Sequence, residues 1–389
     1  MITANEPSVW DKHVPVEESG YIFKEEPELW LGSKNQISAE KPLIVDLFCG
    51  AGGASTGFEM AGFSVLLGID HHIPSLQTFF FNHPQSTCIL GDIRKIKKES
   101  IPRSILEKNI DVLLAGVPCQ GFSLNNRKRH SEDKRNFLFL EFIRFLKIFK
   151  PRFCVLENVS GMMSTANGAF LDQIENCIVE AGKEVGCDYV VEKRLLNAAD
   201  FGVPQIRKRL FFIARPRGTR FDWPTPRFGK ERPYRTVLQA IGDLPSLPSP
   251  GEEKNSYDKP PFDDYQREMR EGAITLLNHK APKHPAETIR KIAETLPGEP
   301  MYDRFNQRIR LDWEKPSPTQ VCGGIRPQFQ FGHPSEPRGL SVRERARIQS
   351  FPDRYNFLGG IVQGRVQTGN AVPPLLAKAI AEAIKESMT

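Results

Sequence analysis

Two short stretches carry residues whose types and spacing could do chemistry. The first, Asp46–Gly53, is a glycine-rich turn directly after an apolar run. The second, Gly116–Ser123, follows another apolar run and places Cys119 behind a proline. Glycines let a backbone turn tightly and approach a ligand closely, and an ionised thiol is a nucleophile. Together the stretches suggest a nucleotide-like cofactor held beside a reactive cysteine.

Acidic residues extend the glycine-rich turn. Asp70 ends the next apolar run, where a carboxylate could hold ribose hydroxyls, and Asp92 ends a third short run, where it could accept a bond from an adenine amino group. NAD enzymes and S-adenosylmethionine enzymes share this arrangement. The NAD fingerprint needs a third glycine where this chain has Ser55, so the match to NAD is poor. Each piece alone could be an ordinary turn with solvated carboxylates, but the three together favour a cofactor.

Three further residues could assist Cys119. A free thiol has a pKa of about 8.5 and is barely ionised at neutral pH, so a nearby arginine such as Arg207 or Arg209 would help. Glu157 follows four apolar residues, where desolvation would raise its pKa and let it give a proton or hydrogen bond to a base. Taken singly, Cys119 could be an inert buried thiol, the two arginines a solvated basic edge, and Glu157 an ordinary strand-end acid.

The elements expected to position these residues alternate between strands and helices. Such alternation predicts an α/β fold with a mostly parallel sheet and helices on both faces, in which ligands bind outside the carboxyl ends of the strands. Strands are predicted at Leu43–Leu47, Ser64–Ile69, Asp111–Ala115, Phe153–Leu156 and Leu210–Ala214, and helices at Ala54–Ala61, Pro74–Phe81, Asn136–Phe149 and Ala169–Ala181. Both chemical stretches follow such strands.

Composition divides the chain into four parts. The region after the predicted sheet is rich in proline, glycine and acids, and only Pro285–Thr295 there has a helical pattern. Helical patterns return at Val342–Ser350 and Pro373–Ser387. The predicted parts are an N-terminal extension (1–41), a catalytic domain (42–215), a smaller irregular domain (216–339) and C-terminal helices that complete the catalytic domain (340–389).

Composition also excludes several classes. The seven cysteines form no CxxC pair and no cluster with histidine, which argues against a zinc site and a disulfide framework. No run of eighteen apolar residues occurs, and Met1–Pro7 lacks the features of a secretory signal, so a cytoplasmic protein is expected. The net charge of +6 suits a polyanionic partner without demonstrating one.

Taken together, the motifs resemble those of the C5-cytosine-specific DNA methyltransferases of bacterial and phage restriction–modification systems. The resemblance implies a Rossmann-like S-adenosylmethionine-dependent sheet, a target-recognition domain at 216–339, double-stranded DNA as substrate, and a cytoplasmic, nucleoid-associated location. The matching segments stand in the family's order: Asp46–Phe63, Gly116–Ser123, Glu157–Val159, Gln205–Arg209, Arg343–Asp353 and Gly369–Val372.

The resemblance also implies a mechanism. Cys119 would add to carbon 6 of a cytosine flipped out of the duplex, which makes carbon 5 nucleophilic toward the methyl sulfonium. Glu157 would hold N3 and the exocyclic amino group, Arg209 would hold the base carbonyl, and Arg207 would steady the loop or a phosphate. Loss of the carbon 5 proton would then expel the thiol.

Binding roles follow from the same resemblance. Phe48 would stack on adenine, and the other implied cofactor contacts are Gly50, Gly52, Asp70, Asp92, Pro118, Asn370 and Val372. The expected DNA contacts are Gln120, Ser123, Gln205, Arg127 and Arg129 in a basic loop that closes over DNA, and Arg326 in a glycine-containing loop that could equally be a plain turn. No metal is expected, a cognate restriction endonuclease is a candidate partner, and a monomer is expected.

Three alternatives remain open from the sequence. A tRNA cytosine-5 methyltransferase could use the same scaffold, although that branch typically has Pro-Pro-Cys-Gln-Pro-Phe-Thr where this chain has Val-Pro-Cys-Gln-Gly-Phe-Ser. A NAD-dependent oxidoreductase is disfavoured by Ser55. A catalytically inactive DNA-binding module is disfavoured because Cys119, Glu157 and Arg209 are all present.

Overall fold

The computed structural model describes residues 2–3, 26–33, 40–117, 138–163, 169–303, 305–322 and 330–388. Within these ranges the chain forms two compact units, each built from segments that are distant in sequence. The first unit comprises Met1–Leu196, Lys208–Pro224 and Ala377–Thr389, and the second comprises Asn197–Arg207 and Thr225–Leu376.

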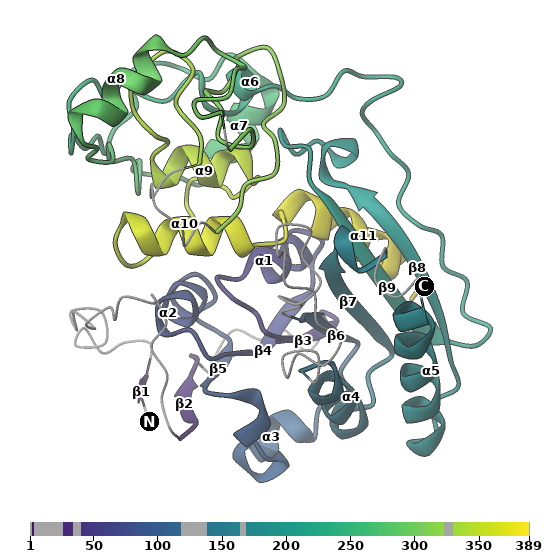
Figure 1. Ribbon diagram of the computed structural model, residues 1–389. Coiled ribbons are helices and arrows are strands. Elements are labelled where there is room, and N and C mark those ends of the chain that lie inside the picture. The colour runs from purple at the N-terminus through teal and green to yellow at the C-terminus, as the bar shows by residue number, and fades with distance from the viewer. Residues whose placement is uncertain are drawn as a thin grey trace. The chain divides into compact units, whose positions relative to one another are not determined.

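A nine-stranded sheet organises the described part of the first unit, in the order β1-β2-β5-β4-β3-β6-β7-β9-β8 (Figure 1). Strands β5, β4, β3, β6 and β7 are parallel neighbours, and β9 runs antiparallel to β7. The strands are β1 (Ile2–Thr3), β2 (Glu28–Leu31), β3 (Leu43–Leu47), β4 (Ser64–Asp70), β5 (Thr87–Leu90), β6 (Val112–Gly116), β7 (Phe153–Val159), β8 (Tyr189–Asn197) and β9 (Lys208–Pro216). The predicted α/β fold with a mostly parallel sheet is confirmed.

Helices cover both faces of this sheet, as the sequence predicts. Ser55 of α1 bonds Asp46, and Phe79 of α2 lies 2.5 Å from the position that a Cβ on Gly68 would take. Their strand neighbours, such as Val45 and Leu67, point the other way and pack with α4 and α5. The helices of this unit are α1 (Gly53–Met60), α2 (Ile73–Asn82), α3 (Arg103–Leu106), α4 (Leu138–Phe149), α5 (Ala169–Glu184) and the residues from Ala377 of α11 (Pro374–Glu386).

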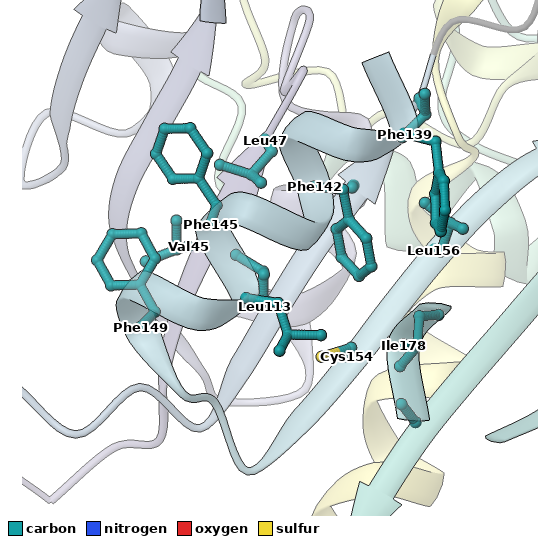
Figure 2. Close-up of a cluster of buried hydrophobic side chains, with 14 of the residues drawn as sticks. Val45, Leu47, Leu113, Phe139, Phe142, Phe145, Phe149, Cys154, Leu156 and Ile178 are labelled. Carbon is teal, nitrogen blue, oxygen red and sulfur yellow. The ribbon is translucent and has the colours of Figure 1, made fainter. Parts of the chain in front are cut away.

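A phenylalanine stripe on α4 forms the centre of the main hydrophobic cluster (Figure 2). Phe142, Phe145 and Phe149 recur at three- and four-residue spacing, so they share one face of the helix. They pack on strand residues that include Leu113 and Leu156. Burying each such side chain contributes roughly 1.5–3 kcal/mol, so this cluster is a main support for the strand ends that carry the site.

The N-terminal extension contributes a strand that the sequence analysis does not predict. Residues 28–31 form β2, which pairs antiparallel with the edge of β5. Trp30 is buried there and packs against Phe80, with ring centroids 5.7 Å apart. The sequence shows no strand periodicity there, because this edge strand has only four residues.

The second unit is mainly helices and irregular segments. Its helices are α6 (Val237–Ile241), α7 (Asp264–Arg270), α8 (Ala286–Glu294), α9 (Val342–Ile348) and α10 (Ile361–Asn370). The prediction of a single helix in 216–339 is wrong, since α6 and α7 also form there. Both are short and are started by side-chain caps, Thr236 with Gln239 for α6 and Asp263 for α7. Such helices are too short to leave a clear 3.6-residue pattern.

Buried ion pairs around α9 hold the second unit together. Arg347 donates to both carboxyl oxygens of Asp353 and also pairs with Asp243 at 3.1 Å. Arg338 makes two 2.8 Å bonds to Glu344. Burial would raise the pKa of Asp353, but Arg347 and its neighbours outweigh it and hold that pKa below the usual value. Removing one partner of such a pair would leave a buried charge uncompensated.

Candidate active site

Three neighbouring strand ends bring the two chemical stretches together in the first unit. Strand β6 lies between β3 and β7, and Gly116 at its end is level with Glu157. A Cβ added to Gly116 would lie 3.6 Å from a carboxyl oxygen of Glu157 and 4.0 Å from the carbonyl oxygen of Phe48. The glycine-rich turn, the start of the cysteine loop and the predicted acid therefore converge on one point.

Glu157 and Arg209 form an ion pair at this point. The Nε atom of Arg209 lies 2.9 Å from Oε1 of Glu157, and the two side chains are only 13% and 16% exposed, respectively. They come from β7 and β9, which pair antiparallel and place them diagonally on one face. Burial lowers the pKa of Arg209 from its usual value, against the opposing effect of Glu157. The pair is a desolvated, rigid donor–acceptor set, suited to hydrogen-bonding a planar polar ring.

Asn158 supports the root of the cysteine loop. Its Nδ2 donates to the carbonyl oxygen of Val117 at 3.4 Å, and its side-chain oxygen accepts from the amide of Val159 at 2.8 Å. Both Asn158 and Val117 are buried. Asn158 had no predicted role of its own, and the sequence pointed to it only through its place directly after Glu157.

The loop residues themselves lie outside the described part of the chain. These are the predicted nucleophile Cys119, with Pro118, Gln120, Ser123, Arg127 and Arg129, and also Arg326 in the other unit. Their roles remain predictions.

The glycine-rich turn is held by Asp70. Gly50 and Gly52 adopt left-handed φ values of 55° and 82°, and Phe48 does so at 59°. The Asp70 carboxylate accepts the amide of Gly50 at 2.8 Å and the amide of His72 at 2.8 Å. A Cβ on Gly50 would meet nothing within 4 Å, so this side of the turn is open toward a ligand. Asp70 thus has a structural task beside the predicted ribose contact.

Ser55 and Asp46 lock the other side of the turn. The hydroxyl of Ser55 donates to Oδ2 of Asp46 at 2.6 Å, and both side chains are buried. Burial raises the pKa of Asp46 to about 7, with the Ser55 bond opposing that rise. At the level of the sequence, Ser55 served only as evidence against an NAD site. Its geometry now explains why a serine stands there, since it anchors α1 to β3.

Asp92 stands at the end of β5, as predicted. It starts a short 3₁₀ helix, Ile93–Lys95, by accepting the amide of Arg94 at 3.0 Å. The side chain of Arg94 also bonds both carboxyl oxygens, which lowers the pKa of Asp92. The carboxylate is 27% exposed and so reaches solvent, and its lowered pKa keeps it ionised at neutral pH.

Two residues with predicted contacts are buried in the second unit. Gln205 was expected to touch DNA, but it is fully buried in the second unit, where it donates to Gln349 at 3.1 Å and accepts the amide of Gln320 at 2.9 Å. Arg207 is also buried, and it donates to the carbonyl oxygens of Gln320 and Gly369 at 2.7 and 2.9 Å. The two roles predicted for Arg207, steadying the loop or a phosphate, remain predictions.

The last predicted cofactor residues belong to the second unit. Asn370 is exposed at the end of α10, and Val372 is buried just beyond it. Gly369 before them allows α10 to touch the backbone at Val321 and Cys322, since a Cβ there would lie 2.4 Å from the amide nitrogen of Cys322.

Among the residues that the structure describes, no group of three or more histidines, cysteines or acids could hold a metal ion. In the same residues, no helix combines the length and apolar character needed to cross a membrane.

Comparison with known proteins identifies the family. Residues 43–386 match the C-5 cytosine-specific DNA methylase family. The Type II methyltransferase M.DdeI of Desulfomicrobium norvegicum is 37% identical, covering 88% of each chain. M1.HphI of Haemophilus parahaemolyticus is 35% identical, covering 92% of this chain and 90% of its own. A crystal structure attributed to a DNA modification methyltransferase of an E. coli prophage superposes with a TM-score of 0.72 at 25% identity, covering 90% of this chain and 99% of its own. The chain therefore belongs to the C-5 cytosine-specific DNA methylases and is a DNA cytosine-5 methyltransferase of the restriction–modification type.

Proposed function

We propose that this enzyme methylates carbon 5 of a cytosine that is flipped out of a specific duplex DNA sequence, through a covalent adduct with Cys119. The observation that carries the proposal is the Glu157–Arg209 pair beside Gly116, at the start of the Cys119 loop. A buried carboxylate next to a guanidinium presents an acceptor and donors side by side. That pattern complements the N3, amino and carbonyl edge of cytosine.

Each bond change can be assigned to a group of this chain. The thiolate of Cys119 bonds carbon 6, and the electrons of the 5,6 double bond move into the ring toward N3. Glu157 stabilises the added charge by hydrogen-bonding or protonating N3, while Arg209 holds the ring carbonyl. Carbon 5 takes up the methyl group, its proton leaves to a base, and the carbon–sulfur bond breaks to restore the double bond and free Cys119.

S-adenosylmethionine, when bound, supplies an electrophilic methyl group. The residues around the glycine-rich turn fit its adenosine part, because the turn is open at Gly50 and carboxylates stand at the ends of β4 and β5. We assign Asp70 to the ribose, Asp92 to the adenine amino group and Phe48 to the adenine face. The remaining proposed contacts are Gly50, Gly52, Pro118, Asn370 and Val372.

The other roles are proposed from the same geometry. Arg207 ties Gln320 to Gly369 and so positions the segment that leads into the proposed reading loop at Arg326. Residues 216–339 would read the sequence, 340–389 would complete the catalytic domain, and Arg127 and Arg129 would contact phosphates. We further propose that the enzyme acts as a monomer on nucleoid DNA in the cytoplasm, beside a cognate endonuclease.

The Cys119→Ser variant tests the mechanism. A serine hydroxyl is hardly ionised at neutral pH, so we expect methyl transfer to fall below detection while duplex binding persists. Tritium transfer from labelled S-adenosylmethionine to duplex DNA measures the first quantity, and equilibrium binding measures the second. Cys177→Ser on α5, which changes another partly exposed thiol, serves as the control. Full turnover by Cys119→Ser would overturn the covalent mechanism, and transfer to tRNA in place of DNA would overturn the substrate assignment.

A further inference from the structure

Two buried arginines of the second unit lack an acidic partner among the residues that the structure describes. Arg365 of α10 is 7% exposed, and its guanidinium makes no hydrogen bond or ion pair within those residues. Arg345 of α9 is 3% exposed and donates only to uncharged groups, the hydroxyl of Thr368 at 3.1 Å and the carbonyl oxygen of Val321 at 3.0 Å. Burying a cation without an anion is costly, so this arrangement calls for a physical reason.

Two other buried arginines of the unit do have acidic partners. Arg347 is paired with Asp353, and Arg338 is paired with Glu344. Among the described residues, no carboxylate acts on either Arg345 or Arg365, and each has a lowered pKa, chiefly through burial. The two uncompensated side chains are close enough that Arg365 lowers the pKa of Arg345 further. They therefore form a local excess of positive charge inside the protein.

Helix packing fixes where this charge lies. Helices α9 and α10 meet so closely at Gly364 that an added Cβ would lie 2.5 Å from a methyl group of Val342. Thr368, the hydroxyl partner of Arg345, follows Arg365 by one helical turn. The guanidinium of Arg365 is not sealed from solvent, because its unbonded nitrogens are not among the fully enclosed ones. Solvent access to this guanidinium is therefore small but not closed.

The surroundings favour an anion over any other ligand. His284 accepts the amide of Gly339 through Nε2, and burial, together with Arg365, lowers its pKa to about 4, so it is neutral at physiological pH. A tetrahedral oxyanion with several acceptor oxygens matches guanidinium donors in charge and geometry.

We infer that Arg365 and Arg345 bind one phosphate of the DNA backbone, beside the segment that leads into the proposed reading loop. This inference rests on the DNA substrate of the proposed function. A phosphate would compensate the two buried guanidinium charges when DNA is bound, which gives a reason for burying them without an acidic partner. The contact would fix the register of the recognition unit on the duplex without reading a base.

Arg365→Gln tests the inference, with Arg365→Lys as the charge-preserving variant and Arg267→Gln as the matched control. Arg267 lies on α7 of the same unit and is exposed and paired with Asp264. We expect Arg365→Gln to bind duplex DNA roughly tenfold more weakly and the slope of log affinity against log salt to fall by about 0.9, the value for one phosphate. The control should keep both values, and Arg365→Lys should retain most of the slope.

Thermal stability separates binding from a structural role. Removing an uncompensated buried charge should leave the Tm of the DNA-free protein unchanged or raised. A lowered Tm with an unchanged salt slope would instead show a structural arginine and overturn the inference.

Inorganic phosphate, compared with chloride at equal ionic strength, tests whether the site takes a free phosphate ion or a phosphate of the DNA backbone. We expect phosphate to raise the Tm of the wild type more than that of Arg365→Gln. If phosphate does so while the DNA salt slope of Arg365→Gln stays unchanged, the assignment to DNA is wrong. Methylation by the wild type, measured in parallel, shows whether the proposed function itself holds.

Discussion

At the residue scale, the proposed methyl transfer depends on the Glu157–Arg209 pair. Neither side chain alone distinguishes a catalytic residue from an ordinary strand-end acid or a basic edge. Their 2.9 Å contact, low exposure and place beside Gly116 support the catalytic role that we propose for them. Two charges taken out of water and held rigidly can act on a base edge without first reorganising solvent.

Arg209→Lys should expose the geometric part of this role. Lysine keeps the charge but loses the planar fork, so one of the two contacts to Glu157 and the base cannot form. We expect kcat/KM for methylation to fall by roughly 10²–10³-fold, since that is the usual cost of losing one preorganised donor. Arg217→Lys, an exposed residue just beyond β9 that pairs with Asp188, is the control. A kcat/KM within threefold of the wild type would show that the guanidinium geometry is not needed.

At the element scale, helix α10 and the segment 320–322 form one packed assembly within the second unit. Arg207 and Arg345 donate hydrogen bonds to carbonyl oxygens of the helix and of the segment. Gly369 lets the helix lie directly on the Val321–Cys322 backbone. These three hydrogen bonds, together with the absence of a side chain at Gly369, fix the start of the proposed reading loop. From the sequence, Gly369 could be recognised only as part of the Gly369–Val372 motif.

Gly369→Ala should break this assembly. A methyl group would stand 2.4 Å from backbone atoms that cannot rotate away, so helix or segment must shift. Overpacking of this kind costs ~1–3 kcal/mol, and we expect a matching drop in the free energy of unfolding, with weaker selection of the target sequence. Gly360→Ala, at the start of the same helix, meets nothing within 4 Å and should be near neutral. Urea denaturation measures both variants, and equal stability of the two would refute the packing argument.

The sequence predicted elements well where periodicity was strong. Strand β3 was predicted to the residue, and α2 within one residue at each end, because long apolar runs and repeats leave clear patterns. The short helices α6 and α7 and the strand β2 were missed because four to seven residues carry too little pattern. The burial of Gln205 and Arg207 could not be foreseen either, since a basic strand edge looks the same whether solvent or protein covers it.

At the scale of the whole molecule, the two units are stabilised in different ways. Both bury many apolar side chains, but the second also buries ion pairs such as Arg347–Asp353 and Arg338–Glu344. Buried titratable groups also differ between them. Burial raises the pKa of Asp46 in the first unit to about 7, and lowers the pKa of His333 in the second to about 4.

These shifts predict opposite responses to acid. Between pH 6.5 and 4 the unfolded chain binds a proton at His333 that the folded unit does not, so the second unit loses stability as pH falls. Buried His279, whose pKa is also lowered, acts in the same direction. Between pH 7 and 3.8 folded Asp46 binds a proton that the unfolded chain lacks, so the first unit gains stability. At about 1.4 kcal/mol per pKa unit, the shifts of Asp46 and His333 can each change the free energy of unfolding by ~3–4 kcal/mol across their ranges.

Hydrogen exchange, corrected for the intrinsic pH dependence of the amide rates, can follow both units in one sample. From pH 6.5 to 4.5 we expect protection to fall in α9 and to hold or rise in β3. This range keeps Glu344 ionised, because Arg338 outweighs burial and holds its pKa low. His333→Asn should flatten the response of α9 alone, since asparagine can still accept the amides of Ser335 and Glu336 but does not titrate. Protection of α9 that stays constant over this range in the wild type would show that these histidines do not control the acid stability of the second unit.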